Sequence, residues 1–188
     1  MAELRGIRIG WRFISLYYIN VDRDDVSESY LAAAERGRRY LRICAAARQR
    51  FGNDAVGALY RAWGERYWYT THEGGFEARF LAAAEAVDIT EILASLDLPT
   101  DLADAADDES WDTVLRAESH EAFERTGPDV GTPILTYDPP NGNSLFGPVV
   151  SAVPDDNQAL AFYYALRVFA DFPAFSELKR TKRAPLLS

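Results

Sequence analysis

Residues 129–148 constrain the fold more than any other part of the chain. Ile134-Leu135 and Leu145-Phe146 are two short apolar runs of the kind found in buried strands. Between them, Asn141-Gly142 offers the positive φ angles that tight antiparallel turns need. Pro133 opens the first run, where a proline does not have to donate to a strand ladder. These residues therefore predict a β-hairpin.

Composition narrows the class of protein. The chain has 188 residues, enough for one well-filled domain and too few for two of comfortable size. Its formal net charge of −9 disfavours a nucleic-acid partner, because phosphate binding needs clustered Lys and Arg. No apolar run reaches the length of a membrane span, and the first residues lack a signal-peptide hydrophobic region. One cysteine, Cys44, permits no internal disulfide, which suits a reducing compartment, so we expect a cytoplasmic protein.

A second strand is predicted near the start of the chain. Apolar side chains alternate through residues 7–17, at Ile7, Ile9, Trp11 and Phe13, which indicates a strand with one buried face. Residues 3–5 followed by Gly6 are typical of the last turn of a helix and its glycine stop. The sequence is therefore expected to open in the middle of a larger unit.

A block of helices is predicted between this strand and the hairpin, from apolar spacing and from cap residues. The helices run from a Ser27 cap to Gly52, from an Asn53 or Asp54 cap through Tyr67, over 76–84, from a Thr90 cap to Leu98, over 100–106, and from Trp111 to Gly127.

After the hairpin, residues 154–157 predict the start of another helix with four apolar side chains facing inward: Leu160, Phe162, Leu166 and Phe169. A last short helix is expected over 174–179. The predicted order is strand, five or six helices, strand, strand, helix. This order indicates an α/β sheet that a helical block interrupts.

The segment Val130-Gly131-Thr132-Pro133, followed by a strand and Phe146-Gly147-Pro148, resembles the cis-proline segment of the DsbA-like branch of the thioredoxin superfamily. In that branch a helical domain interrupts the core. The closest group is the mycothiol-dependent nitroreductases, related to FrnE-type oxidoreductases and to 2-hydroxychromene-2-carboxylate isomerase. Other stretches that resemble family positions are 11–16 with Asn20, 44–48, 59–60 with Gly64, 102–106, 119–120 and 176–181.

The resemblance implies a thioredoxin-like, DsbA-type fold that lacks its first β-strand and first helix. Residues 1–19 and 128–188 would form the incomplete core, and residues 20–127 the inserted helical domain. The group's chemistry needs a Cys-x-x-Cys motif at a helix amino terminus, which lowers the thiol pKa. The chain has no such motif, so the nucleophilic cysteine is expected upstream of Met1. Either the start codon is assigned too far downstream, which we favour, or a partner chain or a rearranged sheet stabilises a genuine remnant.

The resemblance also implies a substrate-binding site. Thr132 and Pro133, with Val130 and Gly131 before them, would form one side of it: the Thr132–Pro133 bond would be cis, and the Thr132 backbone would pair with an extended thiol or disulfide substrate.

Three residues of the helical block are further candidates for this site. Asn20 and Tyr30 would face the active site and hold a thiol or an aromatic acceptor, although loop polarity and helix packing explain them equally well. His120 could donate a proton, since histidine titrates near neutrality, but a surface or packing role is the simpler interpretation.

Other residues that invite a functional interpretation have simpler explanations. Cys44 lies in an alanine-rich helical stripe, which indicates a buried small hydrophobe rather than a nucleophile. The acidic side chains of residues 101–112 lack the spacing of a calcium loop, so we expect no metal site. His72 lies in a predicted polar turn with no chemical partner.

The expected function is that of a thiol-disulfide oxidoreductase that resembles mycothiol-dependent nitroreductase. Residues 1–188 alone are expected to be inactive, because the Cys-x-x-Cys segment that supplies the nucleophile is missing. Its partners would be a mycothiol-like low-molecular-weight thiol, as a co-substrate rather than a tightly bound cofactor, and a disulfide or electron-poor aromatic substrate. The sequence does not determine whether the protein forms a homodimer. Two alternatives remain: a non-catalytic thioredoxin-like binding protein, and a glutathione-transferase-kappa-like isomerase in which serine replaces the cysteine.

Overall fold

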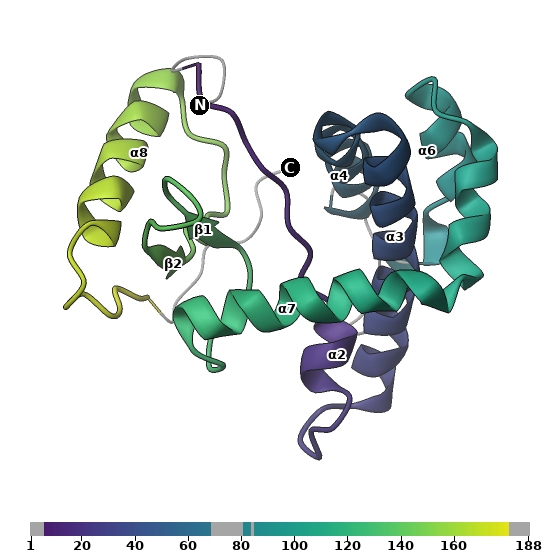
Figure 1. The fold of residues 1–188 in the computed structure, drawn as a ribbon, viewed down its shortest axis with the longest axis horizontal. Helices are drawn as coiled ribbons and strands as arrows, with labels where there is room; N and C mark the ends of the chain where they lie inside the picture. Colours follow the sequence, from purple (N-terminus) through teal and green to yellow (C-terminus); the bar gives the residue numbers. More distant parts are fainter. Residues whose placement is uncertain (1–5, 69–80, 84, 181–188) are drawn as a thin grey trace. The chain divides into compact units, whose positions relative to one another are not determined.

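The computed structural model describes residues 6–68, 81–83 and 85–180 (Figure 1). The chain divides into two compact units. Residues 10–120 form the first, which we term the helical unit. Residues 1–9 and 121–188 form the second, which we term the hairpin unit. Helix α7 (Asp112–Thr126) begins in the helical unit and ends in the hairpin unit.

Helix α3 is the centre of the helical unit and packs against α2, α4 and η1 (Figure 1). Besides the start of α7, the helices of this unit are α2 (Leu16–Asn20), α3 (Glu28–Phe51), α4 (Asn53–Trp68), α6 (Ile89–Ser95) and the 3₁₀ helices η1 (Thr100–Asp107) and η2 (Glu109–Trp111). Residues 81–83 and 85–86 are also helical.

The ends of these helices follow from local chemistry. Ser27 caps α3 as predicted, because its side chain accepts a hydrogen bond from the Tyr30 N–H. Gly52, with φ of 83°, ends the helix. The predicted Thr90 cap of α6 is wrong by two residues: the Asp88 carboxylate accepts from the N–H groups of Thr90 and Glu91.

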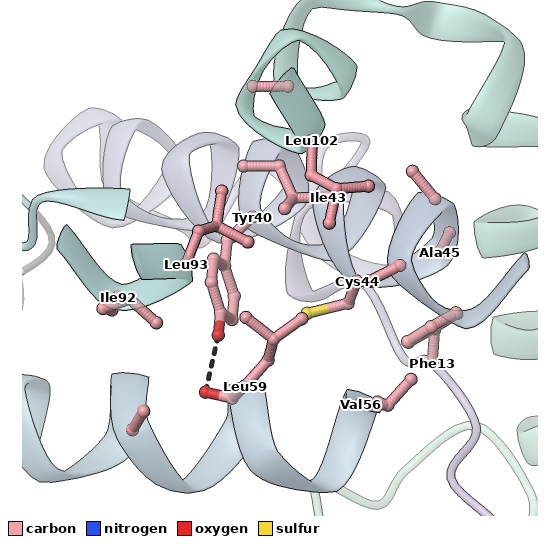
Figure 2. Close-up of a cluster of buried hydrophobic side chains, with 14 of the residues drawn as sticks. Phe13, Tyr40, Ile43, Cys44, Ala45, Val56, Leu59, Ile92, Leu93 and Leu102 are labelled. Atoms are coloured by element: carbon pink, nitrogen blue, oxygen red, sulfur yellow. Dashed lines mark hydrogen bonds between the residues drawn. The ribbon is translucent and has the colours of Figure 1, made fainter. Parts of the chain in front are cut away.

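The core of the helical unit is apolar and forms around α3 (Figure 2). The Cys44 sulfur points into it, toward the Leu59 side chain (Figure 2). The hydroxyl of the buried Tyr40 has a hydrogen-bond partner, because it donates to the Leu59 carbonyl at 2.7 Å. Other buried members of the core include Phe13, Ile43, Val56, Ile92, Leu93, Leu102 and Leu115.

The strand predicted over residues 7–17 is wrong. Residues 7–15 have no regular secondary structure, and α2 starts at Leu16. Alternate backbone N–H groups of this segment donate to side chains instead of a neighbouring strand. The pairs are Trp11 N–H to Asn53 Oδ1 (2.9 Å), Phe13 N–H to Glu118 Oε2 (2.8 Å) and Ser15 N–H to Ser119 Oγ (3.0 Å). The period-two pattern is real, but side chains of α4 and α7 take the place of a ladder.

Glu118 is the main anchor of this segment. Its buried carboxylate also accepts from the guanidinium groups of Arg12 and Arg48, at 2.8 and 2.9 Å. Burial alone would raise its pKa, but these hydrogen bonds, with that from Phe13 N–H, outweigh burial and hold the pKa below its usual value. Because residues 11–15 are bound to helices in this way, the helical unit starts at residue 10. The family resemblance led us to expect the helical domain to start at residue 20.

The hairpin unit contains the predicted hairpin. Strands β1 (Ile134–Thr136) and β2 (Ser144–Phe146) pair antiparallel, with Ile134 opposite Phe146. The Gly147 N–H donates to the Pro133 carbonyl at 2.8 Å, which continues the pairing beyond β2. Helix α8 (Asp156–Ala170) follows, beside the hairpin in Figure 1. Tyr137 meets Tyr163 of α8 edge-on, with ring centroids 6.0 Å apart.

The connection between the strands differs from the tight turn that the sequence predicted. Neither Asn141 nor Gly142 has a positive φ; Asp138 does, at 47°. A glycine is needed at 142 for a different reason, because a Cβ there would lie 1.5 Å from the Tyr137 carbonyl oxygen. The chain therefore folds into a wider loop over residues 137–143.

Helix α8 begins as predicted, with Asp155 and Gln158 forming a reciprocal capping box. Two predictions about this region are wrong. Phe162 is 48% exposed rather than inward-facing. Residues 174–179 are not helical, because the chain after α8 turns back and stacks Phe175 on Phe169, with centroids 4.6 Å apart.

Some predictions fall outside the described residues. These are the helix end at 3–5, His72, and the part of the 76–84 helix before residue 81.

Candidate functional site

The segment that leads into β1 lies at the surface of the hairpin unit. Thr132 and Pro133 are exposed. The Pro133 carbonyl is occupied by Gly147 N–H, but within the described ranges no residue hydrogen-bonds to the backbone of Thr132. The Thr132–Pro133 peptide bond is cis, as are Pro139–Pro140 and Gly147–Pro148. The backbone N–H and C=O of Thr132 are therefore open to an extended ligand.

An apolar surface borders this segment. A Cβ at Gly131 would lie 3.5 Å from the nearest atom of the Phe146 ring, so the backbone at Gly131 passes close to that ring. Phe146 itself is 40% exposed, and Val149 and Val150, after the hairpin, are also exposed. Val130 is half-buried. An aromatic or extended apolar group could therefore contact the surface beside the open Thr132 backbone.

Asn20 and Tyr30 lie in the helical unit. Asn20 is the last residue of α2, and its side-chain amide donates back to the carbonyl of Leu16, the first residue of that helix, at 2.8 Å. Tyr30 is in the first turn of α3 and half-buried, and burial raises the pKa of its hydroxyl despite the opposing charge of Arg23. Asn20 thus has a local structural role within α2, and its role in substrate binding stays a prediction.

His120 is the last residue of the helical unit, on α7. Its side chain is exposed, whereas the preceding Ser119 is buried and donates to the Leu115 carbonyl. The candidate residues are thus distributed over both units, with Val130, Gly131, Thr132 and Pro133 together in the hairpin unit and Asn20, Tyr30 and His120 in the helical unit.

Cys44 has the environment of a packing residue. It is 2% exposed, and burial raises the pKa of its thiol to about 12, against smaller opposing effects of Tyr40 and Arg48. Thiol reactivity requires the thiolate, which is scarce near neutral pH at such a pKa. The interpretation of Cys44 as a buried small hydrophobe agrees with this position.

A polar cluster between α2, α3 and α7 was not predicted from the sequence. Arg42, only 3% exposed, makes two hydrogen bonds of 2.7 Å to the Asp112 carboxylate at the start of α7. Arg38 donates to the Tyr18 hydroxyl at 3.0 Å, and Arg116 lies over the Tyr18 ring. Arg38 and Arg42 are one helical turn apart, a spacing that could have pointed to this cluster. These contacts join three helices and explain the cluster as structural.

Within residues 6–68, 81–83 and 85–180, no group of His, Cys, Asp or Glu side chains could hold a metal ion. None of the described helices has the length and apolar character needed to cross a membrane.

Comparison with known protein families identifies a family that this chain matches. A family model described as "Rv2466c-like: Mycothiol-dependent nitroreductase Rv2466c" matches residues 1–180. The matched range includes both the segment before β1 and the candidate residues of the helical unit.

Proposed function

The chain belongs to the Rv2466c-like mycothiol-dependent nitroreductase family, and from this membership we propose that it serves as a thiol-dependent oxidoreductase of DsbA-like thioredoxin fold. The substrates we propose are a mycothiol-like small thiol and a disulfide or electron-poor aromatic acceptor. The thiol is a co-substrate that is consumed in the reaction, not a resident cofactor.

The observation that carries this proposal is the open backbone of Thr132 beside Phe146. An extended disulfide needs a backbone donor and acceptor to fix its direction, and Thr132 offers both. An aromatic acceptor needs an apolar surface, which Phe146 and Val149 offer next to that backbone. Both requirements are met within the hairpin unit alone.

The chemistry we propose is thiol–disulfide exchange. A thiolate attacks one sulfur of the substrate disulfide, forms a mixed disulfide and releases the other sulfur as a thiolate, which takes up a proton. A small thiol then attacks the substrate-derived sulfur of the mixed disulfide, which forms a new disulfide between the small thiol and that sulfur and restores the first thiolate. Cys44 is not this nucleophile, because it is buried in the core with a pKa of about 12. We propose that the attacking cysteine belongs to a segment outside residues 1–188, so that these residues alone have no turnover.

The experiment is a redox assay on the 188-residue chain and on Cys44→Ser. Each is incubated with mycothiol and either a small disulfide or a nitroaromatic, and product formation is followed. We expect both proteins to match the protein-free rate. Turnover by the 188-residue chain that Cys44→Ser abolishes would refute the assignment of Cys44 as a packing residue.

A non-catalytic binding protein is the second candidate, favoured by the same burial of Cys44. Translation of the DNA upstream of Met1, in frame, separates the alternatives. A strand followed by Cys-x-x-Cys supports the oxidoreductase, and a serine in that position supports an isomerase. An in-frame stop without such a segment supports the binding protein.

A further inference from the structure

The helical unit has a pocket of about 270 Å³ that is separate from the segment before β1 and lies between α3, α4, the start of α6 and η1. Tyr40 and Ile43 of α3 line it and are buried. The other described residues that line it are Trp63 of α4, Val87 just before α6, Ile89 at the start of α6, Ala103 and Ala106 of η1, and Arg36 and Arg39 of α3. This volume is near the lower end for small-molecule sites and suits a ligand of one or two rings.

The interior of the pocket favours a flat apolar group. Trp63 stacks between Tyr40 and Tyr67, at centroid distances of 5.2 and 4.2 Å and interplanar angles of 21° and 17°. The stack holds the indole in a fixed orientation, so its place in the lining does not depend on a ligand. The Tyr40 hydroxyl is already bonded to Leu59, which leaves its ring rather than its polar end for contact. Aromatic ligands gain from such rings by offset or edge contacts.

Among the described residues that line the pocket, Arg36 and Arg39 are the only charged ones, and both are cations. Each holds a carboxylate on the protein surface: Arg36 holds Glu85 at 2.7 Å and Arg39 holds Asp107 at 2.8 Å. All four side chains are substantially exposed, and exposed pairs of this kind contribute little to stability. A guanidinium has five N–H donors, so each arginine can take a second anion.

We propose that this pocket binds a flat, apolar organic acid of one or two aromatic rings, with its carboxylate or sulfonate between Arg36 and Arg39. The rings occupy the space beside Trp63, above Tyr40 and Ile43. The acid group is what makes the site selective, because the remaining N–H donors of Arg36 and Arg39 can hold an anion by charge-assisted hydrogen bonds. This site does not depend on the redox function proposed above.

The test uses 2-naphthoate as the probe, with 2-naphthalenemethanol as its uncharged counterpart, in isothermal titration calorimetry on the 188-residue chain. We expect saturable binding of one naphthoate per chain. The double variant Arg36→Gln/Arg39→Gln should weaken naphthoate binding by about tenfold, as loss of a charge-assisted contact predicts, and leave the alcohol nearly unaffected.

Arg50→Gln is the matched control. Arg50 also lies on α3 and also pairs with an exposed carboxylate, Asp101 at 3.1 Å, but it is not part of the pocket lining. Its substitution should leave both affinities unchanged. If Arg50→Gln weakens naphthoate as much as the double variant does, general charge attraction explains the binding and the proposal fails.

A second variant tests the location. Ala103→Leu places a larger side chain in the pocket and should abolish binding of both probes, while the circular dichroism spectrum reports that the helices are intact. Naphthoate binding that persists in folded Ala103→Leu would place the ligand elsewhere, for example on the exposed apolar side chains of α8. Absence of saturable binding at millimolar naphthoate would also overturn the proposal.

Discussion

The two units of the chain treat their apolar side chains in opposite ways. The helical unit buries its large ones around α3, and among its described residues only Phe51 and Tyr60 are large hydrophobics that remain exposed. In the hairpin unit, the described large hydrophobics are at most partly buried, and many are exposed. The exposed ones are Ile9, Phe146, Val149, Val150, Val153, Phe162, Tyr164, Val168, Phe172 and Leu178.

This difference indicates how far each unit is specified by its own residues. The helical unit has a closed core and satisfied polar groups at Tyr40 and Glu118. Helix α8 carries apolar side chains around its circumference, as helices do when they are buried on more than one side. In the DsbA-like fold that we propose, a central strand and a further helix would cover such a surface. The comparison thus links the exposed apolar surface to the proposed fold.

Core substitutions should have the largest effect on the free energy of unfolding. Leu59→Ala, at a side chain with 0% exposure, should lower the free energy of unfolding by about 2–5 kcal/mol. Val168→Ala in α8, where the side chain is 67% exposed, should change it by less than about 0.5 kcal/mol. Urea denaturation followed by circular dichroism gives both numbers. Comparable losses for the two variants would mean that α8 is buried in solution and that the contrast between the units is wrong.

Removal of the Glu118 charge should have the next largest effect. Glu118→Gln leaves the Arg48 guanidinium without its anionic partner inside the helical unit, at a cost of about 3 kcal/mol near neutral pH. The matched control is Glu121→Gln, one turn along α7, whose ion pair with Arg125 is partly exposed and should contribute less than about 1 kcal/mol.

The same variant predicts a pH dependence. The folded state holds the pKa of Glu118 below the ordinary value of 4.5, so its contribution to stability is present above that pH and is lost as the pH falls through the lowered pKa. The difference in unfolding free energy between the natural chain and Glu118→Gln should therefore shrink as the pH falls below about 4.5. A constant difference between pH 7 and the acid limit of about 3 would show that Glu118 does not act as a paired carboxylate.

Removal of helix caps should have the smallest effects. In the helical unit the loss should affect global unfolding, whereas in the hairpin unit it should stay within one helix. Asp88→Ala removes the cap of α6 and should cost about 1 kcal/mol in global unfolding. Asp155→Ala removes the capping box of α8 and should mainly increase hydrogen exchange within α8, because few buried contacts tie that helix to the rest of the chain. Exchange that rises equally throughout the chain in Asp155→Ala would contradict this.

Local features of the fold were predictable from sequence where one residue determines them. Ser27 and Asp155 start helices because their side chains reach nearby N–H groups, and Gly52 ends one because it accepts a positive φ. The hairpin pairing followed from two apolar runs close together in the chain.

Features that depend on distant residues were not predictable. The alternation at Trp11 and Phe13 indicated a strand, but it is equally compatible with a segment held by the side chains of Asn53 and Glu118. For the candidate site, the sequence located the segment before β1, whereas the open backbone of Thr132 beside Phe146 became visible only in three dimensions. The pocket beside Trp63 combines residues from four elements, so no local sequence pattern predicts it.

The central claim is that a small thiol or disulfide binds at the segment before β1. Two-dimensional ¹H–¹⁵N NMR of the 188-residue chain, titrated with the disulfide of mycothiol, tests it directly. We predict saturable shifts of the Gly131 and Thr132 amides, and no shifts of Ala45 and Ala47 in the buried part of α3. Shifts confined to the helical unit, with Gly131 and Thr132 unchanged at saturation, would contradict the account.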